Sequence, residues 1–544
     1  MPVANRKWEW HNSQKTSAPV AGPKYQVFYP PIFDQTRYHP FETPTTRRKA
    51  VIQSITNFQL KSSWLTKLSD RTASIAWLDR EIEILILGYG TDAREKAEEE
   101  RRKKENEPVW MPVEDVYDVL IGLKEYILQL REEGVSIEPD PTAVSVWRKD
   151  DVLDQETRGA LIDAVTILKN TPYEARGWGP LIANSKAIDL LDPFMYPIIY
   201  HQTLSSSPFS SFSSSLNPSP FQLVRTPDLP PYCSNPTDGG SCWLPTDFQI
   251  LPDGKTNILS YINNLTLPGQ AELFHPIFEE IFTKVVPLFN HVLADLLRAP
   301  WMEGWRPPGS YEGKRRDLAD KWMWTRPEIL DHNRLEGKVA KVVTRLVNIE
   351  AEASGEGDGY VGNDDTRCLD WHFDGAANEL VIATVIYNCT PQTTTSSSSP
   401  SIPPNLHLRR RHPISSYGHR FKSNFISEPI SIKQNTAIAF PNTYEHRLST
   451  TSHPSTLLLF HLLDPLHPSP PPSTTTIPPQ QQSQYLHADL LRKSKIGTLL
   501  PEEIFQQILE YTQGNVISPE DAVHNRKLFI GRRESQRDDI IRQY

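Results

Sequence analysis

Hydrophobic residues recur at three- and four-residue spacing in the first part of the chain, as they do along one face of a helix. The clearest stripe consists of Val116, Leu120, Leu123, Ile127 and Leu130. Gly134 follows the stripe, and a glycine at this place is a common helix stop. The pattern predicts a helical region over residues 46–202, preceded by an extended arm over residues 1–45.

A second and longer stripe of this kind predicts a helix over residues 270–298. Pro276 and Pro287 lie within it, and we expect each of them to begin or kink the helix. The hydrophobic face is broad, so we interpret it as core packing and assign it no ligand.

Short segments rich in β-branched and aromatic residues follow in the second half of the chain. They cover residues 339–349, 369–372, 380–387, 406–409, 437–440 and 457–463. Several short strands without long helices between them predict an antiparallel sandwich or barrel.

Low-complexity stretches interrupt these elements. We interpret residues 203–220 as a disordered Ser/Pro-rich insertion, 391–404 as an insertion between strands and 466–483 as a linker. Helices are expected over residues 484–544, one of them opened by Ser518 as N-cap with Pro519 in its first turn.

Composition narrows the class of protein. The net charge is −9 and the pI about 6.0, which give no electrostatic reason for binding to nucleic acid or to an anionic membrane. Four cysteines in 544 residues are too few for a disulfide scaffold. With no hydrophobic run long enough to span a membrane and no leader at Met1, we expect a soluble protein of the cytoplasm or nucleus.

Candidate chemistry centres on His372, Asp374 and His446. In an extended strand residues i and i+2 point to the same side, so His372 and Asp374 can face one point, and His446 follows a later strand. Two histidines and one carboxylate on one face of a metal suit Fe(II) in an enzyme that activates oxygen. The sequence therefore predicts a metal site made by these three side chains.

The spacing alone is not informative. With 16 His and 66 acidic residues in 544 positions, a His followed two residues later by Asp or Glu is expected roughly twice by chance. It occurs twice, and the second case, His487 with Asp489, lies in a polar stretch without a strand partner. The hydrophobic strands around His372 and His446 distinguish the first case.

The motifs around these residues resemble those of a large, mainly fungal family of uncharacterised proteins. The likeness runs from about residue 40 to the C-terminus, and the motifs that carry it occupy residues 243–245, 260–265, 347–350, 371–379, 439–447 and 477–481. That family is regarded as related to iron- and 2-oxoglutarate-dependent oxygenases. The resemblance implies an α+β fold with a double-stranded β-helix (jelly-roll) core over residues 221–465, an N-terminal helical region and a C-terminal helical tail.

The resemblance also implies an activity. The expected function is that of an Fe(II)/2-oxoglutarate-dependent oxygenase that oxidises a C–H bond of an unknown substrate. One alternative is a pseudo-enzyme or interaction protein that keeps the barrel without cosubstrate turnover. Another is a metal-binding barrel with non-oxidative chemistry.

Two departures from the family pattern affect the site. Family members more often carry Glu where this chain has Asp374. The second departure is a missing cation: the family has Arg just before the last barrel strand, whereas residues 452–457 contain neither Arg nor Lys. That Arg would grip the distal carboxylate of 2-oxoglutarate. Arg447 and Arg409 are the substitutes that we expect.

Other polar residues lie on or beside the predicted strands. Asn348 and Tyr387 are expected to line the pocket, and His461 is interpreted as a surface or strand-end residue. The basic cluster that begins at Arg409 is interpreted as a charged edge strand rather than a binding site for an anion.

Overall fold

The computed structural model of the chain describes sixteen stretches of the sequence and leaves the rest out. They are residues 46–89, 113–138, 146–172, 187–206, 221–226, 240–265, 269–297, 326–350, 371–391, 403–410, 425–426, 429–449, 454–480, 499–505, 507 and 517–542. The expected arm over residues 1–45 lies outside them, as does most of the insertion over residues 391–404.

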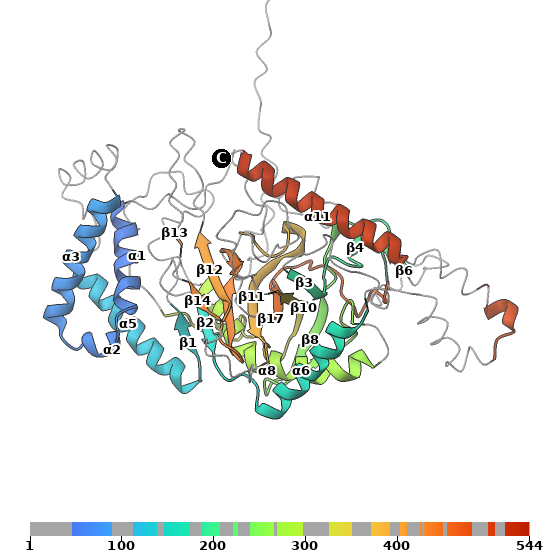
Figure 1. Cartoon of the computed structure of the whole chain (residues 1–544), viewed down its shortest axis with the longest axis horizontal. Helices are drawn as coiled ribbons and strands as arrows, with labels where there is room; N and C mark the ends of the chain where they lie inside the picture. The colour runs from blue at the N-terminus through green and yellow to red at the C-terminus, as the bar shows by residue number, and fades with distance from the viewer. Residues whose placement is uncertain are drawn as a thin grey trace, which may run out of the picture.

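Helices dominate the N-terminal part, as the hydrophobic spacing predicts. They are α1 (Thr46–Gln59), α2 (Trp64–Lys67), α3 (Arg71–Tyr89), α5 (Val113–Glu132) and α6 (Gln155–Asn170). In Figure 1, α1, α3 and α5 form a group at one end of the molecule, and α1 and α3 both contact α5. The predicted stripe lies on α5 with its residues buried, and Gly134 adopts a φ of 68° just after the helix.

The protein has a mixed α/β fold with a large antiparallel sheet. Its strands are β1 (Ser136–Glu138), β2 (Val146–Lys149), β3 (Ala187–Leu191), β8 (Thr246–Ile250), β9 (Thr256–Ile258), β10 (Val339–Ile349), β11 (Val381–Asn388), β15 (Ala437–Pro441) and β17 (Ser455–Leu463). Their order is β1-β2-β15-β11-β17-β10-β8-β9, with β3 also paired to β10. The predicted helical region thus contributes three strands to this sheet, so it is not a separate helical unit.

One long helix covers one face of the large sheet. It is α8 (Gln270–Leu297), which contacts β2, β9, β11 and β15 and lies below the sheet in Figure 1. Phe282 on this helix packs against Phe248 and Phe460 of the sheet, with ring centroids 4.6 and 5.3 Å apart. Pro276 and Pro287 both lie inside the helix, so neither of them begins it.

A second, smaller sheet lies against the opposite face. It contains β12 (Asn405–Arg410), β13 (Phe425–Ile426), β14 (Ile430–Ser431) and β16 (Glu445–Leu448). A buried cluster joins the two sheets, with Leu406 and Leu408 from the smaller sheet against Leu457 and Leu459 from the large one. After β11 the chain enters the small sheet for β12, β13 and β14, returns to the large sheet for β15, crosses again for β16 and ends in the large sheet with β17.

Short strand pairs complete the β-structure. Strand β4 (Ile198–Ile199) pairs with β7 (Ser241–Cys242), and β5 (Leu204–Ser206) pairs with β6 (Phe221–Leu223). The segment expected as a disordered insertion over residues 203–220 therefore begins with a strand; its remainder from residue 207 lies outside the described stretches.

The second half of the expected linker, residues 471–480, packs into the fold. Ile477 is buried, and Ser473 donates a hydrogen bond to the carboxylate of Asp247 at 2.5 Å. Gln480 donates to the backbone carbonyl oxygens of Tyr196 and Pro197, each at 3.1 Å. A Pro/Ser/Thr-rich composition predicts a lack of regular structure, but small polar side chains can still bond to buried groups.

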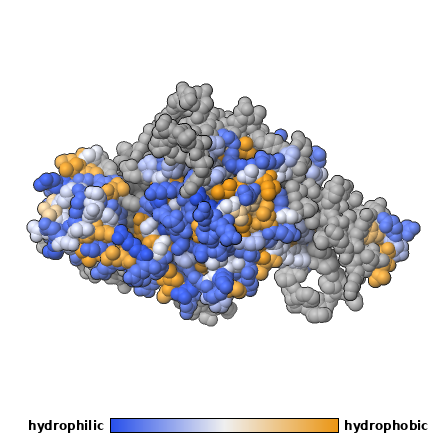
Figure 2. Space-filling model, turned by 60° about the horizontal axis from the view of Figure 1, so that its bottom comes forward, coloured by the Kyte–Doolittle hydropathy of each residue, from blue (hydrophilic) through white to orange (hydrophobic). Residues whose placement is uncertain are grey.

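The C-terminal helix α11 (Pro519–Arg542) opens as the sequence predicts, with Ser518 accepting a hydrogen bond from the backbone N–H of Asp521 at 3.0 Å. It crosses the upper part of the molecule in Figure 1. In the part of the chain that the structure describes, no helix is long and apolar enough to cross a membrane. The face in Figure 2 is mostly hydrophilic, with small hydrophobic patches between the polar areas.

Candidate metal centre

His372 and His446 come from segments that the fold pairs directly. Residues 372 and 446 form an isolated antiparallel bridge, in which each backbone N–H donates to the other residue's carbonyl oxygen, at 3.0 and 2.9 Å. His446 lies on β16 of the small sheet, so the bridge adds His372 to the edge of that sheet. The two imidazole centroids are 4.3 Å apart.

Asp374 is held by the turn that follows His372. Gly375 adopts a φ of 74°, a conformation that side chains other than glycine rarely take. The next residues form a short 3-10 turn, η4 (Ala377–Glu379), and the buried Glu379 accepts hydrogen bonds from the backbone N–H groups of Ala376 and Trp243. The turn thus begins directly after Asp374, and its hydrogen bonds fix the backbone on that side of the carboxylate.

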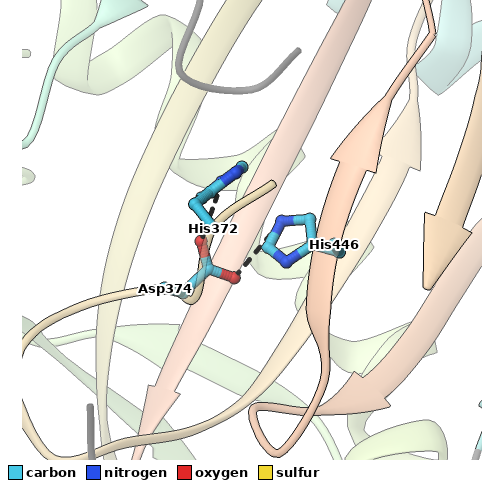
Figure 3. Close-up of side chains that lie close together, drawn as sticks. All are labelled: His372, Asp374 and His446. Atoms are coloured by element: carbon cyan, nitrogen blue, oxygen red, sulfur yellow. Dashed lines mark ion pairs between the residues drawn. The ribbon is translucent and has the colours of Figure 1, made fainter. Parts of the chain in front are cut away.

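The three side chains present their donor atoms to one point. Asp374 Oδ1 lies 3.9 Å from His372 Nε2, and Oδ2 lies 3.7 Å from His446 Nε2, as Figure 3 shows with dashed lines. One donor atom from each of the three residues lies within 4.8 Å of the other two. The structure therefore brings together all three residues that the sequence predicts as metal ligands.

Electrostatics fit a cation at this point. Asp374 and His446 are 2% and 1% exposed, and His372 is half-buried. Burial alone would raise the pKa of Asp374, but the charges of His461, His446 and His372 hold this pKa well below its usual range. Burial lowers the pKa of His446, which favours the neutral imidazole that binds metals.

His461 lies beside the candidate ligands, whereas the sequence predicted a surface or strand-end position for it. It is fully buried on β17, and its Nδ1 lies 3.4 Å from Asp374 Oδ2 and 3.1 Å from the hydroxyl oxygen of Thr384. Thr384 in turn donates a hydrogen bond of 2.5 Å to the same carboxylate oxygen. The segment around His461 is hydrophobic on both sides, so its pattern gives no sign of which face the histidine occupies.

The expected anchors Arg447 and Arg409 lie on the other face of the small sheet. Leu408 is opposite His446 across the ladder and faces the core between the sheets, and neighbouring residues in a strand point the opposite way. The guanidinium carbons of Arg409 and Arg447 lie 4.3 and 5.1 Å from the ring centroid of Trp371, on that outer side. Arg409 also forms an ion pair with Glu445.

The expected pocket residues Asn348 and Tyr387 also point away from the three candidate ligands. Tyr387 belongs to the core between the large sheet and α8, and its hydroxyl donates to Asn435 Oδ1 at 2.9 Å. Asn348 accepts a hydrogen bond from Thr456 at 3.1 Å, and both occupy the helix-facing positions of their strands.

A different cation faces the space between the sheets. Arg345 on β10 is 4% exposed and makes two hydrogen bonds to Asp189, from Nε at 2.7 Å and Nη2 at 3.1 Å. Burial lowers the pKa of the His446 imidazole most, and the charges of His461 and Arg345 lower it further although Asp374 opposes them. In the sequence, only the position of Arg345 in the middle of a hydrophobic strand indicates that this arginine could be buried.

The fold and these residues describe a mixed α/β protein with a candidate site of two histidines and one aspartate. The chain belongs to the family described as "Protein of unknown function (DUF4246)", which matches residues 117–398, more than half of its 544 residues. The matched region contains His372 and Asp374 and ends before His446. No curated protein matches the chain.

Among solved structures the chain is similar to a selenomethionine-labelled Fe(II)/(alpha)ketoglutarate-dependent dioxygenase, TqaL. The identity is 11%, the match covers 43% of this chain and 72% of that chain, and the TM-score is 0.21. A score this low supports no conclusion about this protein, so its function has to be argued from the site.

Proposed function

We propose that the protein is an Fe(II)-dependent oxygenase whose metal is held by His372, Asp374 and His446. The observation that carries the proposal is the convergence of two imidazoles and a fully buried carboxylate within 4.8 Å. A buried carboxylate needs a compensating charge. A divalent cation supplies it, and two neutral nitrogen ligands with one oxygen ligand suit Fe(II) in oxygenases.

The strand order supports a double-stranded β-helix as the core of this proposal. Strands β10, β11, β15 and β17 form the centre of the large sheet, and β12, β14 and β16, together with the bridge at His372, form the opposing sheet. Two facing antiparallel sheets with the chain alternating between them make a jelly-roll arrangement. The candidate ligands then lie at one edge of the small sheet and face the space between the sheets.

In the proposed reaction the protein itself holds the metal through its three ligands and encloses the site between the two sheets. Iron bound here would supply oxygen activation, and 2-oxoglutarate is the cosubstrate that we propose for it. The hydrogen bonds on Asp374 and the bridge between residues 372 and 446 fix the ligands before the metal arrives, while the hydrophobic residues between the sheets exclude water. The proposed reaction is the oxidation of a C–H bond of the substrate.

A second candidate is a barrel that binds metal but has no cosubstrate turnover. It is favoured by the placement of Arg409 and Arg447 on the outer face, because neither points to where a carboxylate bound at the metal would lie. If the protein uses 2-oxoglutarate, a cationic side chain that faces the space between the two sheets must bind the distal carboxylate of this cosubstrate. Arg345 is the inward-facing candidate, provided that it can hold this carboxylate together with Asp189.

Metal binding is tested first. The purified chain, titrated with Fe(II) or Co(II) without oxygen, should bind about one equivalent, and His372→Ala and His446→Ala should each abolish this. His332→Ala, an exposed histidine before β10, is the matched control and should bind like the wild type. Equal metal in the wild type and in His372→Ala would refute the site.

Cosubstrate use then separates the two candidates. Adding 2-oxoglutarate to the anaerobic Fe(II) protein should produce a metal-to-ligand charge-transfer absorption, and admitting oxygen should release succinate. Arg447→Ala should leave the absorption unchanged, whereas Arg345→Met should weaken 2-oxoglutarate binding by well over tenfold. Metal binding without charge transfer or succinate would favour the barrel without turnover.

A further inference from the structure

We propose that His461 and Thr384 are positioning residues that fix the orientation of the Asp374 carboxylate for metal binding. This inference rests on the metal site proposed above and assigns it two residues outside the ligand set. Both lie on the large sheet, opposite the strand that carries His446, so the carboxylate is held from one sheet and the histidines are supplied by the other.

The hydrogen bonds have a defined direction. A carboxylate can only accept, so the single hydroxyl proton of Thr384 is donated to Asp374 Oδ2, 2.5 Å away. The hydroxyl oxygen must then accept from His461 Nδ1 at 3.1 Å. His461 therefore carries its proton on Nδ1, which also lies 3.4 Å from Oδ2.

Both side chains lie against the same oxygen. Oδ2 accepts from Thr384 and lies 3.4 Å from His461 Nδ1, so Oδ1, the oxygen nearer His372, is the one that neither residue contacts, although Oδ2 also lies 3.7 Å from His446 Nε2. A carboxylate fixed in this way would bind the metal through one oxygen, so more positions on the metal remain open for other ligands. Partners of this kind commonly tune metal affinity by about 10- to 100-fold.

Packing fixes His461 itself. Its imidazole lies against Trp243 with centroids 5.3 Å apart, and Trp243 packs edge-on against Phe194 at 5.4 Å. Val343 and Thr384 flank His461 on the two neighbouring strands. The imidazole therefore has one well-packed orientation, which a positioning residue requires.

The fold offers a matched control for the threonine. Thr344 on β10 is also a buried threonine of the large sheet, but it pairs with Phe460 and so faces α8. Its hydroxyl has no hydrogen-bond partner in the part of the chain that the structure describes. Thr344→Val repeats the same change of side chain without touching the carboxylate.

The experiment is a Co(II) titration followed by visible absorption, which reports the geometry around the metal. Thr384→Val and His461→Leu should each weaken Co(II) binding by about 10- to 100-fold and change the absorption bands. Thr384→Ser keeps the hydroxyl, and His461→Asn places an amide N–H near the position of Nδ1, so both should stay within a few-fold of the wild type. Thr344→Val should match the wild type in affinity and spectrum.

Several results would overturn the proposal. Wild-type affinity and spectrum in both Thr384→Val and His461→Leu would remove any positioning role, and equal weakening in Thr344→Val would assign the effect to sheet packing. A wild-type protein that binds no Co(II), or whose binding survives His372→Ala, would remove the metal site and this role with it. If His461→Leu does not fold, Thr384→Val and Thr384→Ser decide the question between them, because valine and threonine have nearly the same shape.

Discussion

Asn442 holds the backbone of Asp374 from both sides. Its side-chain oxygen accepts from the Asp374 N–H at 3.0 Å, and its amide nitrogen donates to the Asp374 carbonyl oxygen at 2.7 Å. The same nitrogen also donates to the carbonyl oxygen of Val381 at 2.9 Å. The loop that follows β15 thus fixes the segment that carries two of the three candidate ligands.

Removing this contact should damage stability and metal binding together. Asn442→Ala removes three hydrogen bonds to buried backbone groups, so we expect the free energy of unfolding to fall by about 3 kcal/mol in urea titrations. Co(II) affinity should fall as well, because Asp374 loses its backbone support. Asn257→Ala, an exposed asparagine on β9, should change stability by less than about 0.5 kcal/mol. A variant as stable as this control would contradict the assignment.

Gly375 should tolerate no side chain. A Cβ there would lie 2.8 Å from Val381 Cγ2 and 3.1 Å from Glu379 Oε2, in addition to the strain of its positive φ. Gly254 has a similar φ of 86° with nothing within 4 Å of a Cβ, so Gly254→Ala measures the strain alone. We expect Gly375→Ala to destabilise the protein by about 1–3 kcal/mol more than Gly254→Ala, measured by urea unfolding. Equal losses would mean that Val381 moves aside at no cost.

The C-terminal helix should depend on one buried ion pair. Arg526 of α11 pairs with Asp192, and their side chains are 5% and 0% exposed. Arg526→Met leaves Asp192 buried without its cation, so a loss of about 3–5 kcal/mol is expected. The control is Lys255→Met, whose lysine is 76% exposed and lies 3.8 Å from Asp253, with an expected loss of at most about 1 kcal/mol. Similar losses in both variants would show that Arg526 does not anchor the helix.

Stability should fall on mild acidification, partly through His291. This side chain lies between Tyr126 and Glu133, 2.9 and 3.2 Å away, and burial lowers its pKa although Glu133 opposes the shift. Below the ordinary histidine pKa of about 6.5 the unfolded chain binds a proton that the folded protein takes up only at lower pH, so folding is disfavoured as the pH falls. Urea midpoints from pH 7 to pH 5 should therefore decrease, and less steeply in His291→Gln. An unchanged slope would exclude His291 as a contributor.

The sequence was most informative where strands are long and hydrophobic. Residues 339–349 were predicted as a strand, and β10 has these same bounds. Strands β11, β15 and β17 differ from their predictions by one or two residues at an end. Runs of β-branched residues buried on both faces leave few alternatives to a central strand.

The same burial on both faces explains why the surroundings of the candidate metal site could not be predicted. In β17 every residue is buried, so no alternation of polar and hydrophobic positions tells which face His461 or Thr456 occupies. The orientation of Asn348, Tyr387 and Arg409 likewise depends on strand pairing, which a single sequence does not reveal. The three candidate ligands could be proposed because their residue types and the hydrophobic strands beside them are visible in the sequence.

The short strands of the N-terminal region were missed for another reason. Strand β2 has four residues and lies between helical segments, yet it pairs with β15, far along the chain. A local hydrophobic pattern does not show that β2 pairs with a strand as distant in sequence as β15, and this pairing is what makes the segment a strand.

The position of β17 in the large sheet has a consequence for how the protein is made. This strand is the last of the sheet in sequence, yet it lies between β10 and β11 and pairs with both. During synthesis β10 and β11 therefore lack their common partner β17 until residue 463 has left the ribosome. Contacts between such distant segments slow folding and leave hydrophobic edges exposed to aggregation. Chains that end before β17 should be insoluble even though they contain most of the strands.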